Sequence, residues 1–332
     1  WDLLPERAAI QLNDTHPVLA IPELMRLLMD LEGLGWEQAW EITTRTFAYT
    51  NHSVMPEAME KWPISVLGKL LPRHLEIIYE INARLLDSVY RLHPGDFDRL
   101  GRMSLIEEGE EPKVRMAHLG VVGSHSVNGV SALHTQILKA RVLRDFHELY
   151  PDRFNNKTNG ITPRRWLKKA NPPLASLITE AIGEAWVTDL DQLRQLALLA
   201  DDPELQSRWR EVKRLNKDRL AAYLRRSQGA ALDPDTLLAC QVKRFHEYKR
   251  QLLNILYVIS LYNRIKAGSD DGSPPRTVLL AGKAAPGYHY AKLTIKLANA
   301  VAELVDADPD VAGRLQVMFL ADYGVSLAEY II

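Results

Sequence analysis

The stretch Thr236-Leu-Leu-Ala-Cys-Gln-Val-Lys-Arg-Phe-His-Glu-Tyr-Lys-Arg250 opens the most regular part of the sequence, and its apolar first half predicts a strand over 236–242. Beyond it, the pattern predicts a helix over 247–266, a strand over 277–281, a helix over 286–305 and a strand over 315–320. Strands that alternate with long amphipathic helices form right-handed β-α-β units around a parallel sheet. The second half of the chain is therefore predicted to be α/β and Rossmann-like.

Basic and polar residues follow each of the three predicted strands, where ligands bind in an open parallel sheet. They are Lys243–Arg250 after the first strand, Gly282-Lys283 and Pro286–Tyr288 after the second, and Asp322–Gly324 after the third. Backbone amides at a helix start favour anions, and the Lys and Arg side chains add to this preference. The pattern indicates a phosphate site. In the alternative interpretation, the first cluster is a solvated, charged helix start, although cations are disfavoured there unless an anion binds.

Common nucleotide-binding signatures are missing from the sequence. It contains no Gly-x-x-x-x-Gly-Lys-Ser/Thr loop and no Gly-x-Gly-x-x-Gly after a strand. These motifs hold the phosphates of nucleoside triphosphates and dinucleotides. Neither binding mode is supported.

Composition narrows the class of protein further. The 332 residues carry a formal net charge of -1, so no long-range field favours nucleic acid or an anionic membrane. The single cysteine, Cys240, excludes an intrachain disulfide and a cysteine-based zinc site, and no metal site is expected. No apolar run approaches the roughly 18 residues of a membrane span. We expect a cytoplasmic protein and, because residue 1 is Trp, a segment of a longer one.

The first half reads as mainly helical. Thr15 is expected to cap a helix that ends near Gly33. Further elements are predicted as helices over 36–46 and 72–92, a strand over 114–122, and a helix that contains Leu133, Ile137, Val142 and Phe146. The polar segment 150–165 reads as the connection between two domains.

Several polar residues of the first half and of this connection lie at predicted element boundaries. Asp14 is either a helix cap or a ligand-binding group, and His125 is either a satisfied core imidazole or part of a site. Hydroxyl and amide groups of the connection, such as Thr158 and Asn159, suit turns and also suit sugar hydroxyls. The residues by themselves indicate a phosphate site and allow a sugar site.

Eight stretches of the sequence resemble the α-glucan phosphorylases, the glycogen, starch and maltodextrin enzymes, in order along the whole chain. They are Gln11-Leu-Asn-Asp-Thr-His-Pro17, Tyr49-Thr-Asn-His52, Leu71-Pro-Arg-His74, Gly123-Ser-His-Ser-Val-Asn-Gly129, Asn156-Lys-Thr-Asn-Gly-Ile-Thr-Pro-Arg-Arg-Trp166, Gln241-Val-Lys-Arg-Phe-His-Glu-Tyr-Lys-Arg-Gln251, Gly282-Lys-Ala-Ala-Pro-Gly-Tyr288 and Val325-Ser-Leu-Ala-Glu329. The resemblance implies a GT-B fold, in which two Rossmann-like domains face each other across a cleft. Residues 1–155 would be the last part of the first domain, and residues 156–332 the first part of the second, cofactor-binding and phosphate-binding domain, so that each is only partly present.

The resemblance also implies roles for residues of the sugar site. His125 and Asn159 would contact the glucosyl unit, with His125 facing the sugar that is transferred. Asp14 and His16 would line the pocket near the anomeric side of that sugar.

A second set of residues is implied for the phosphates. Lys243 would lie near the phosphate of pyridoxal 5'-phosphate, and Tyr323 near the same cofactor. Arg244 and Lys249 would hold the substrate phosphate, and Tyr288 would be an aromatic residue at the mouth of the catalytic channel.

The implied reaction is phosphorolysis of terminal α-1,4-glucan linkages with retention, giving α-glucose 1-phosphate. Glucan and inorganic phosphate would be the substrates, and the parent enzyme a homodimer. The family's glycine-rich loop and its Schiff-base lysine have no counterpart in this sequence, so we expect the chain alone to be inactive. Tyr330 stands where a lysine is expected more often.

Two other interpretations stay open from the sequence. A nucleotide-sugar glycosyltransferase of the same architecture would use such a cleft for a sugar diphosphate, and tight nucleotide-sugar binding would favour it. A non-catalytic carbohydrate-binding or scaffolding protein would bind glucan without phosphate-dependent turnover.

Overall fold

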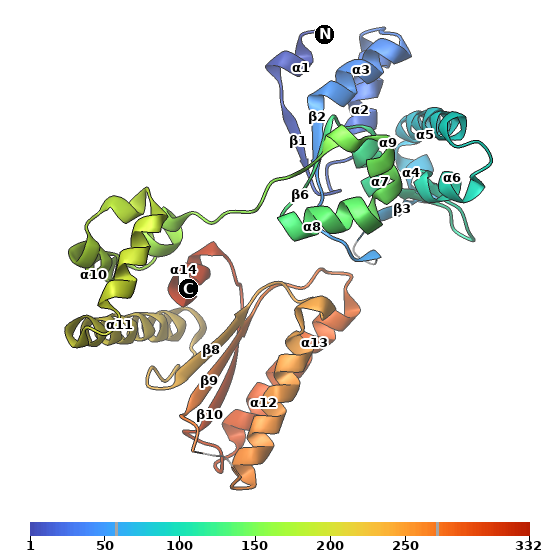
Figure 1. Ribbon diagram of the computed structural model, residues 1–332. Helices are drawn as coiled ribbons and strands as arrows, with labels where there is room; N and C mark the ends of the chain where they lie inside the picture. Colours follow the sequence, from blue (N-terminus) through green and yellow to red (C-terminus); the bar gives the residue numbers. More distant parts are fainter. Residues whose placement is uncertain (57–58, 270–271) are drawn as a thin grey trace. The chain divides into compact units, whose positions relative to one another are not determined.

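The computed structural model describes residues 1–56, 59–269 and 272–332 (Figure 1). Two compact units divide the chain, Trp1–Gly160 (unit 1) and Ile161–Ile332 (unit 2). Unit 1 has one large apolar core, and unit 2 has separate apolar clusters on its sheet and among its first helices.

Unit 1 contains a four-stranded parallel sheet in the order β1-β2-β6-β7. Its strands are β1 (Ile10–Asn13), β2 (Phe47–Thr50), β6 (Ser126–Gly129) and β7 (Phe154–Asn156). The residue patterns did not predict this sheet, and the expectation of a mainly helical first half was incomplete. Strands of three or four residues are too short to show an alternating pattern, so they are hard to recognise in a sequence.

Unit 1 has nine α-helices in the described ranges. They are α1 (Leu4–Arg7), α2 (Ala20–Arg26), α3 (Trp36–Thr46), α4 (Ile64–Leu70), α5 (Pro72–Leu92), α6 (Phe97–Met103), α7 (Met116–Val122), α8 (Ala132–Ile137) and α9 (Arg144–Leu149). α2 continues as a π-helical segment, Leu27–Leu31, and α8 continues as another, Leu138–Val142. The helices predicted over 36–46 and 72–92 are confirmed with those bounds as α3 and α5.

Two predictions for unit 1 are wrong. Thr15 does not cap α2, which begins at Ala20, because the Thr15 hydroxyl donates to Glu60 Oε2 at 2.6 Å instead. The strand predicted over 114–122 is the short β5 (Lys113–Arg115) followed by α7. Six of the seven residues of α7 are buried, so the helix has almost no polar face and its sequence resembles a buried strand. β5 lies between β3 (Lys61–Pro63) and β4 (Ile106–Glu107) in a small antiparallel sheet.

Unit 2 contains the predicted three-stranded parallel sheet, in the order β10-β9-β8. Its strands are β8 (Leu237–Val242), β9 (Arg276–Ala281) and β10 (Leu315–Leu320). The connecting helices α12 (Gln251–Lys266) and α13 (His289–Ala307) lie side by side along the sheet (Figure 1). The Rossmann-like prediction for this half is thereby confirmed.

The helix predicted from residue 247 begins later. Glu247–Lys249 forms a single 3-10 turn, and Arg250 adopts a left-handed conformation with φ 60°, so α12 starts at Gln251. The basic residues 243–250 therefore precede the helix rather than form its first turns.

The remaining helices of unit 2 are α10 (Pro172–Ile182), α11 (Pro203–Gln228) and α14 (Val325–Ile331). 3-10 segments, Ala185–Val187 and Leu190–Leu199, join α10 to α11. α14 packs on α11 through stacked rings of Tyr223 and Tyr330, with centroids 4.5 Å apart. None of the helices in the described ranges has the length and apolar character that crossing a bilayer requires.

Candidate functional site

The carboxyl ends of the four strands of unit 1 meet at one edge of their sheet. The register pairs Asn13 with Thr50, Thr50 with Asn128, and Gly129 with Asn156. Because all four strands are parallel, the residues that follow them gather at this edge, where ligands bind in such sheets. Four of the sequence stretches singled out above end or begin here.

A chain of hydrogen bonds runs along this edge. Gln11 Nε2 donates to Thr50 Oγ1 at 2.8 Å, and Thr50 Oγ1 donates to Asn128 Oδ1 at 2.8 Å. Asn128 Nδ2 donates to the carbonyl oxygen of Gly129 at 3.0 Å. Thr50 and Asn128 are buried, so their polar groups are satisfied and hold the strand ends in register.

Three of the predicted sugar-site residues lie at this edge. Asp14 follows β1 with φ 70°, and its Oδ1 accepts a hydrogen bond from the Thr15 backbone at 2.7 Å. His16 is exposed on the same turn. The backbone N–H of Asn159 donates to the carbonyl oxygen of Val130 at 2.9 Å, and this bond ties the loop after β7 to the loop after β6.

His125 lies elsewhere. It precedes β6, and its backbone N–H donates to the carbonyl oxygen of Phe47, the first residue of β2, at 3.0 Å. The four residues of β6, at about 3.3 Å each, separate it from the edge that carries Asp14. The structure therefore does not bring His125 together with the other predicted sugar-site residues. Its side chain is exposed, so it is not a core imidazole either.

A different histidine occupies the edge. His52 follows β2, is exposed, and has a ring nitrogen 2.5 Å from Asn13 Oδ1. It stands in one of the eight sequence stretches, but we predicted no role for it because β2 was not predicted. The short run Phe47–Thr50 directly after α3 is the sequence feature that could have indicated β2.

The three strands of unit 2 also end together. The register pairs Val242 and Leu320 with Ala281. Beyond the strands the first two loops stay paired, since Lys243 N–H donates to the carbonyl oxygen of Ala281 at 3.0 Å and Phe245 N–H donates to that of Lys283 at 2.9 Å. The predicted meeting of basic residues at one sheet edge is confirmed.

Residues 243–250, the basic loop, present cations to solvent. Lys243 and Arg244 are exposed, and neither side chain has a hydrogen bond or ion pair with any residue in the described part of the chain. The ammonium of Lys249 lies 5.5 Å from the ring centre of Tyr248. Cations that lack acidic partners can neutralise an incoming anion.

Aromatic residues border the basic loop. The Tyr288 hydroxyl donates to Glu247 Oε2 at 2.5 Å, and its ring lies edge-on to that of His246 with centroids 5.0 Å apart. Tyr323 follows β10 and is half-buried, and burial raises the pKa of its hydroxyl. Lys243, Tyr288 and Tyr323 thus come from the three loops of one sheet edge.

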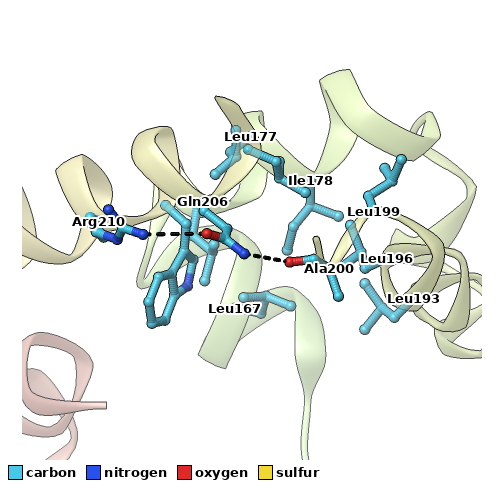
Figure 2. Close-up of a pocket in the computed structure, with 12 residues that line it drawn as sticks. Leu167, Leu177, Ile178, Leu193, Leu196, Leu199, Ala200, Gln206 and Arg210 are labelled. Atoms are coloured by element: carbon cyan, nitrogen blue, oxygen red, sulfur yellow. Dashed lines mark hydrogen bonds between the residues drawn. The ribbon is translucent and has the colours of Figure 1, made fainter. Parts of the chain in front are cut away.

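Two cavities of unit 2 differ in their lining and in their distance along the chain from the basic loop. One, of about 390 Å³, lies beside the basic loop and is lined by His246, Gln251 and residues of α13. The other, of about 610 Å³, lies among α10, α11 and the segment between them and is lined mostly by leucines (Figure 2). Its polar groups pair with each other, because Gln206 donates to the Ala200 carbonyl and accepts from Arg210. None of the predicted site residues lines the larger cavity.

No cluster of three or more His, Cys, Asp or Glu side chains suited to a metal ion occurs in the ranges that the structure describes.

Comparison with known proteins identifies the class. The family model described as "Carbohydrate phosphorylase" matches residues 1–332, and the chain belongs to this family. It is 57% identical over all 332 residues to "Glycogen phosphorylase, muscle form" from Oryctolagus cuniculus and 56% identical to the muscle form from Homo sapiens. It is 55% identical to the brain form from Bos taurus. The chain spans 39% of the length of each of these relatives.

Proposed function

We propose that this chain contributes to reversible phosphorolysis of terminal α-1,4-glucan linkages, with retention and release of α-glucose 1-phosphate. The main support for this proposal is the basic loop, which presents cations without acidic partners at the edge of a parallel sheet. The chain belongs to the carbohydrate phosphorylase family, whose reaction uses phosphate. In this proposal residues 1–155 belong to the family's first domain and residues 156–332 to its second. The relatives are named glycogen phosphorylases, so glycogen is the glucan we propose.

The basic loop would bind the attacking phosphate. Arg244 offers a planar pair of donors that fits two phosphate oxygens, and Lys249 adds a second charge. Two phosphates can approach each other only where their charge is neutralised, which explains why Lys243 stands in the same loop.

The residues of this edge fit a phosphate-bearing cofactor, pyridoxal 5'-phosphate. Because Gly282 has no Cβ atom, the main chain of the basic loop fills the space where that atom would lie. Lys243 has no acidic partner in the described ranges. Lys243 would hold the cofactor and Tyr323 would lie near it. When bound, its phosphate supplies a group that exchanges a proton with the substrate phosphate. Lys243 would stabilise the negative charge in that exchange.

Unit 1 would bind the sugar. Asp14, His16 and Asn159 share the edge with His52, and their neutral and anionic acceptors suit sugar hydroxyls. We propose that His52, rather than His125, faces the transferred glucose, because His52 lies at the carboxyl ends of the strands.

A chimera tests this function. The 332 matched residues of the rabbit muscle relative are replaced by this chain, and glucose 1-phosphate release from glycogen is measured with and without phosphate. The proposal predicts phosphate-dependent release by the chimera, and none by an otherwise identical chimera that carries Arg244→Ala with Lys249→Ala. A folded chimera that binds pyridoxal phosphate and glycogen yet releases no glucose 1-phosphate would contradict it.

A further inference from the structure

Gln251 is buried beneath the basic loop. It is the first residue of α12, and only 2% of its surface is exposed. Its Nε2 donates to the carbonyl oxygen of Arg244 at 2.9 Å and lies 3.5 Å from that of Lys243. Its Oε1 accepts from the backbone N–H of His246 at 3.4 Å. All of these partners are main-chain atoms of the loop.

The other half of the loop is held from the strand. Gln241, on β8, donates from Nε2 to the carbonyl oxygen of Lys249 at 2.9 Å. Asn254, on α12, donates to Gln241 Oε1 at 2.9 Å and orients that amide. The loop is therefore attached at both ends by side-chain amides, whereas the side chains of Lys243 and Arg244 have no partner in the described ranges.

These contacts hold the main chain of the loop in one conformation. Lys243 and Arg244 are adjacent cations that repel each other, and no carboxylate among the described residues orients them. A buried amide is unfavourable unless its hydrogen bonds are made, so Gln251 is restricted to the conformation that grips the loop. Its hydrogen bonds to the carbonyl groups of Lys243 and Arg244 therefore fix the points from which both side chains leave the main chain.

We propose that Gln251 is a positioning residue for anion binding: it holds the main chain at residues 243–246, so that Lys243 and Arg244 face the neighbouring phosphates of cofactor and substrate. This inference rests on the proposed function of the basic loop. Gln251 itself need not touch the anion.

The test uses the 332-residue chain and inorganic phosphate as the probe. Gln251→Met keeps the length of the side chain and removes its hydrogen bonds. The matched control is Gln316→Met, because Gln316 Nε2 also holds a loop of unit 2, at the carbonyl oxygen of Ala231 (2.8 Å), but does so beside the amino end of β10. Phosphate affinity is measured by titration, following the backbone amide signals of Lys243 and Arg244 by NMR.

We expect phosphate to bind Gln251→Met about tenfold more weakly, because small displacements of a preorganised site have large effects on affinity. Gln316→Met should stay within about twofold of the unchanged chain. Melting of unit 2 is recorded for each variant, and if Gln251→Met fails to fold, Gln251→Asn replaces it, since its shorter amide keeps a polar group but cannot reach Arg244.

Arg244→Ala separates failure of this inference from failure of the proposed function. If Arg244→Ala weakens phosphate binding and the folded Gln251 variant does not, the positioning role is wrong while the anion site stands. If phosphate binding is unchanged in Arg244→Ala as well, both are wrong. Equal weakening in Gln316→Met and Gln251→Met would show a general effect on unit 2 and would also overturn the inference.

Discussion

The carbonyl oxygen of Lys243 lies only 1.9 Å from the point where a Cβ atom at position 282 would stand. Position 282 is a glycine, so no such atom is present. Gly282 has φ 149°, a conformation that other residues rarely adopt. The loop after β8 and the loop after β9 pack together at this point. The basic loop can approach the neighbouring strand only because Gly282 has no side chain.

Gly282→Ala should therefore destabilise unit 2 and displace the basic loop. We expect a loss of about 3 kcal/mol in the free energy of unfolding, since the added methyl group meets rigid main chain and the backbone is strained. Urea unfolding followed by circular dichroism measures it. Gly287→Ala in the same loop is the control, because a Cβ atom there has no neighbour within 4 Å. Equal stability of the two variants would contradict the contact.

Arg244→Ala in the chimera should reduce kcat/KM for phosphate by an amount equivalent to about 2–4 kcal/mol, because a charge-assisted contact is lost from the transition state. Glycogen binding should barely change. Arg226→Ala is the matched control, since Arg226 is an exposed arginine in the last turn of α11. Unaltered use of phosphate by Arg244→Ala would remove this residue from the site.

His52 and His125 should differ sharply in their effect on the sugar. In the chimera we expect His52→Ala to lower kcat/KM for glucose 1-phosphate by the equivalent of about 1–3 kcal/mol, the range for one lost hydrogen bond in a polar site. His125→Ala should change it less than about twofold, because His125 lies at the amino end of β6. Parallel kinetics of the two variants decide the matter, and the opposite ranking would restore His125 as the sugar ligand.

His118 should make the stability of unit 1 depend on pH. Burial, with a smaller contribution from Arg115, lowers the pKa of the His118 imidazole to about 4. Its Nδ1 lies 3.2 Å from the carbonyl oxygen of Ser104, and its ring contacts Phe146 edge-on. The folded protein therefore binds a proton less readily than the unfolded chain, whose histidine has a pKa near 6.5.

The resulting stabilisation is complete above about pH 6.5 and is lost as the pH falls toward 4. His118→Gln cannot titrate, so the difference in unfolding free energy between the unchanged chain and this variant should shrink over that window, by at most about 3 kcal/mol. Urea unfolding at a series of pH values measures the difference. A difference that stays constant from pH 7 to pH 4 would show that the imidazole is not held neutral.

Arg153 should be a stabilising residue of unit 1. Its Nη1 lies within hydrogen-bond distance of the carbonyl oxygens of Val121, Val122 and Ser124, at 3.3, 3.1 and 3.0 Å, at the end of α7. We expect Arg153→Leu to lower the unfolding free energy by about 2–3 kcal/mol, because buried carbonyl groups at a helix end lose their donors. Thermal and urea unfolding measure the loss.

The control for Arg153 is Arg144→Leu, which removes an exposed ion pair with Glu148. Such pairs contribute less than about 1 kcal/mol. If both arginine variants unfold alike, the capping role of Arg153 is refuted.

The strands of unit 2 and its basic loop were predictable because the information is local. β8, β9 and β10 each have six residues, and the helices between them are long enough to show their period. The basic cluster 243–250 is contiguous, so its place after β8 followed directly. The conformation of the cluster could not be predicted. Arg250 is left-handed and separates the 3-10 turn from α12, but left-handed residues are usually Gly, Asn or Asp.

The sequence by itself determined the α/β class of unit 2, the positions of α3, α5 and β10, and the concentration of basic residues in the loop after β8. Only the tertiary structure decided that four strands of three or four residues form one parallel sheet in unit 1, and that His52 shares an edge with Asp14 while His125 does not. Apolar periodicity and charge clusters act over neighbouring residues. The pairing of β1, β2, β6 and β7 joins residues 27 to 78 positions apart, and strands that short become stable only when those distant partners supply their hydrogen bonds.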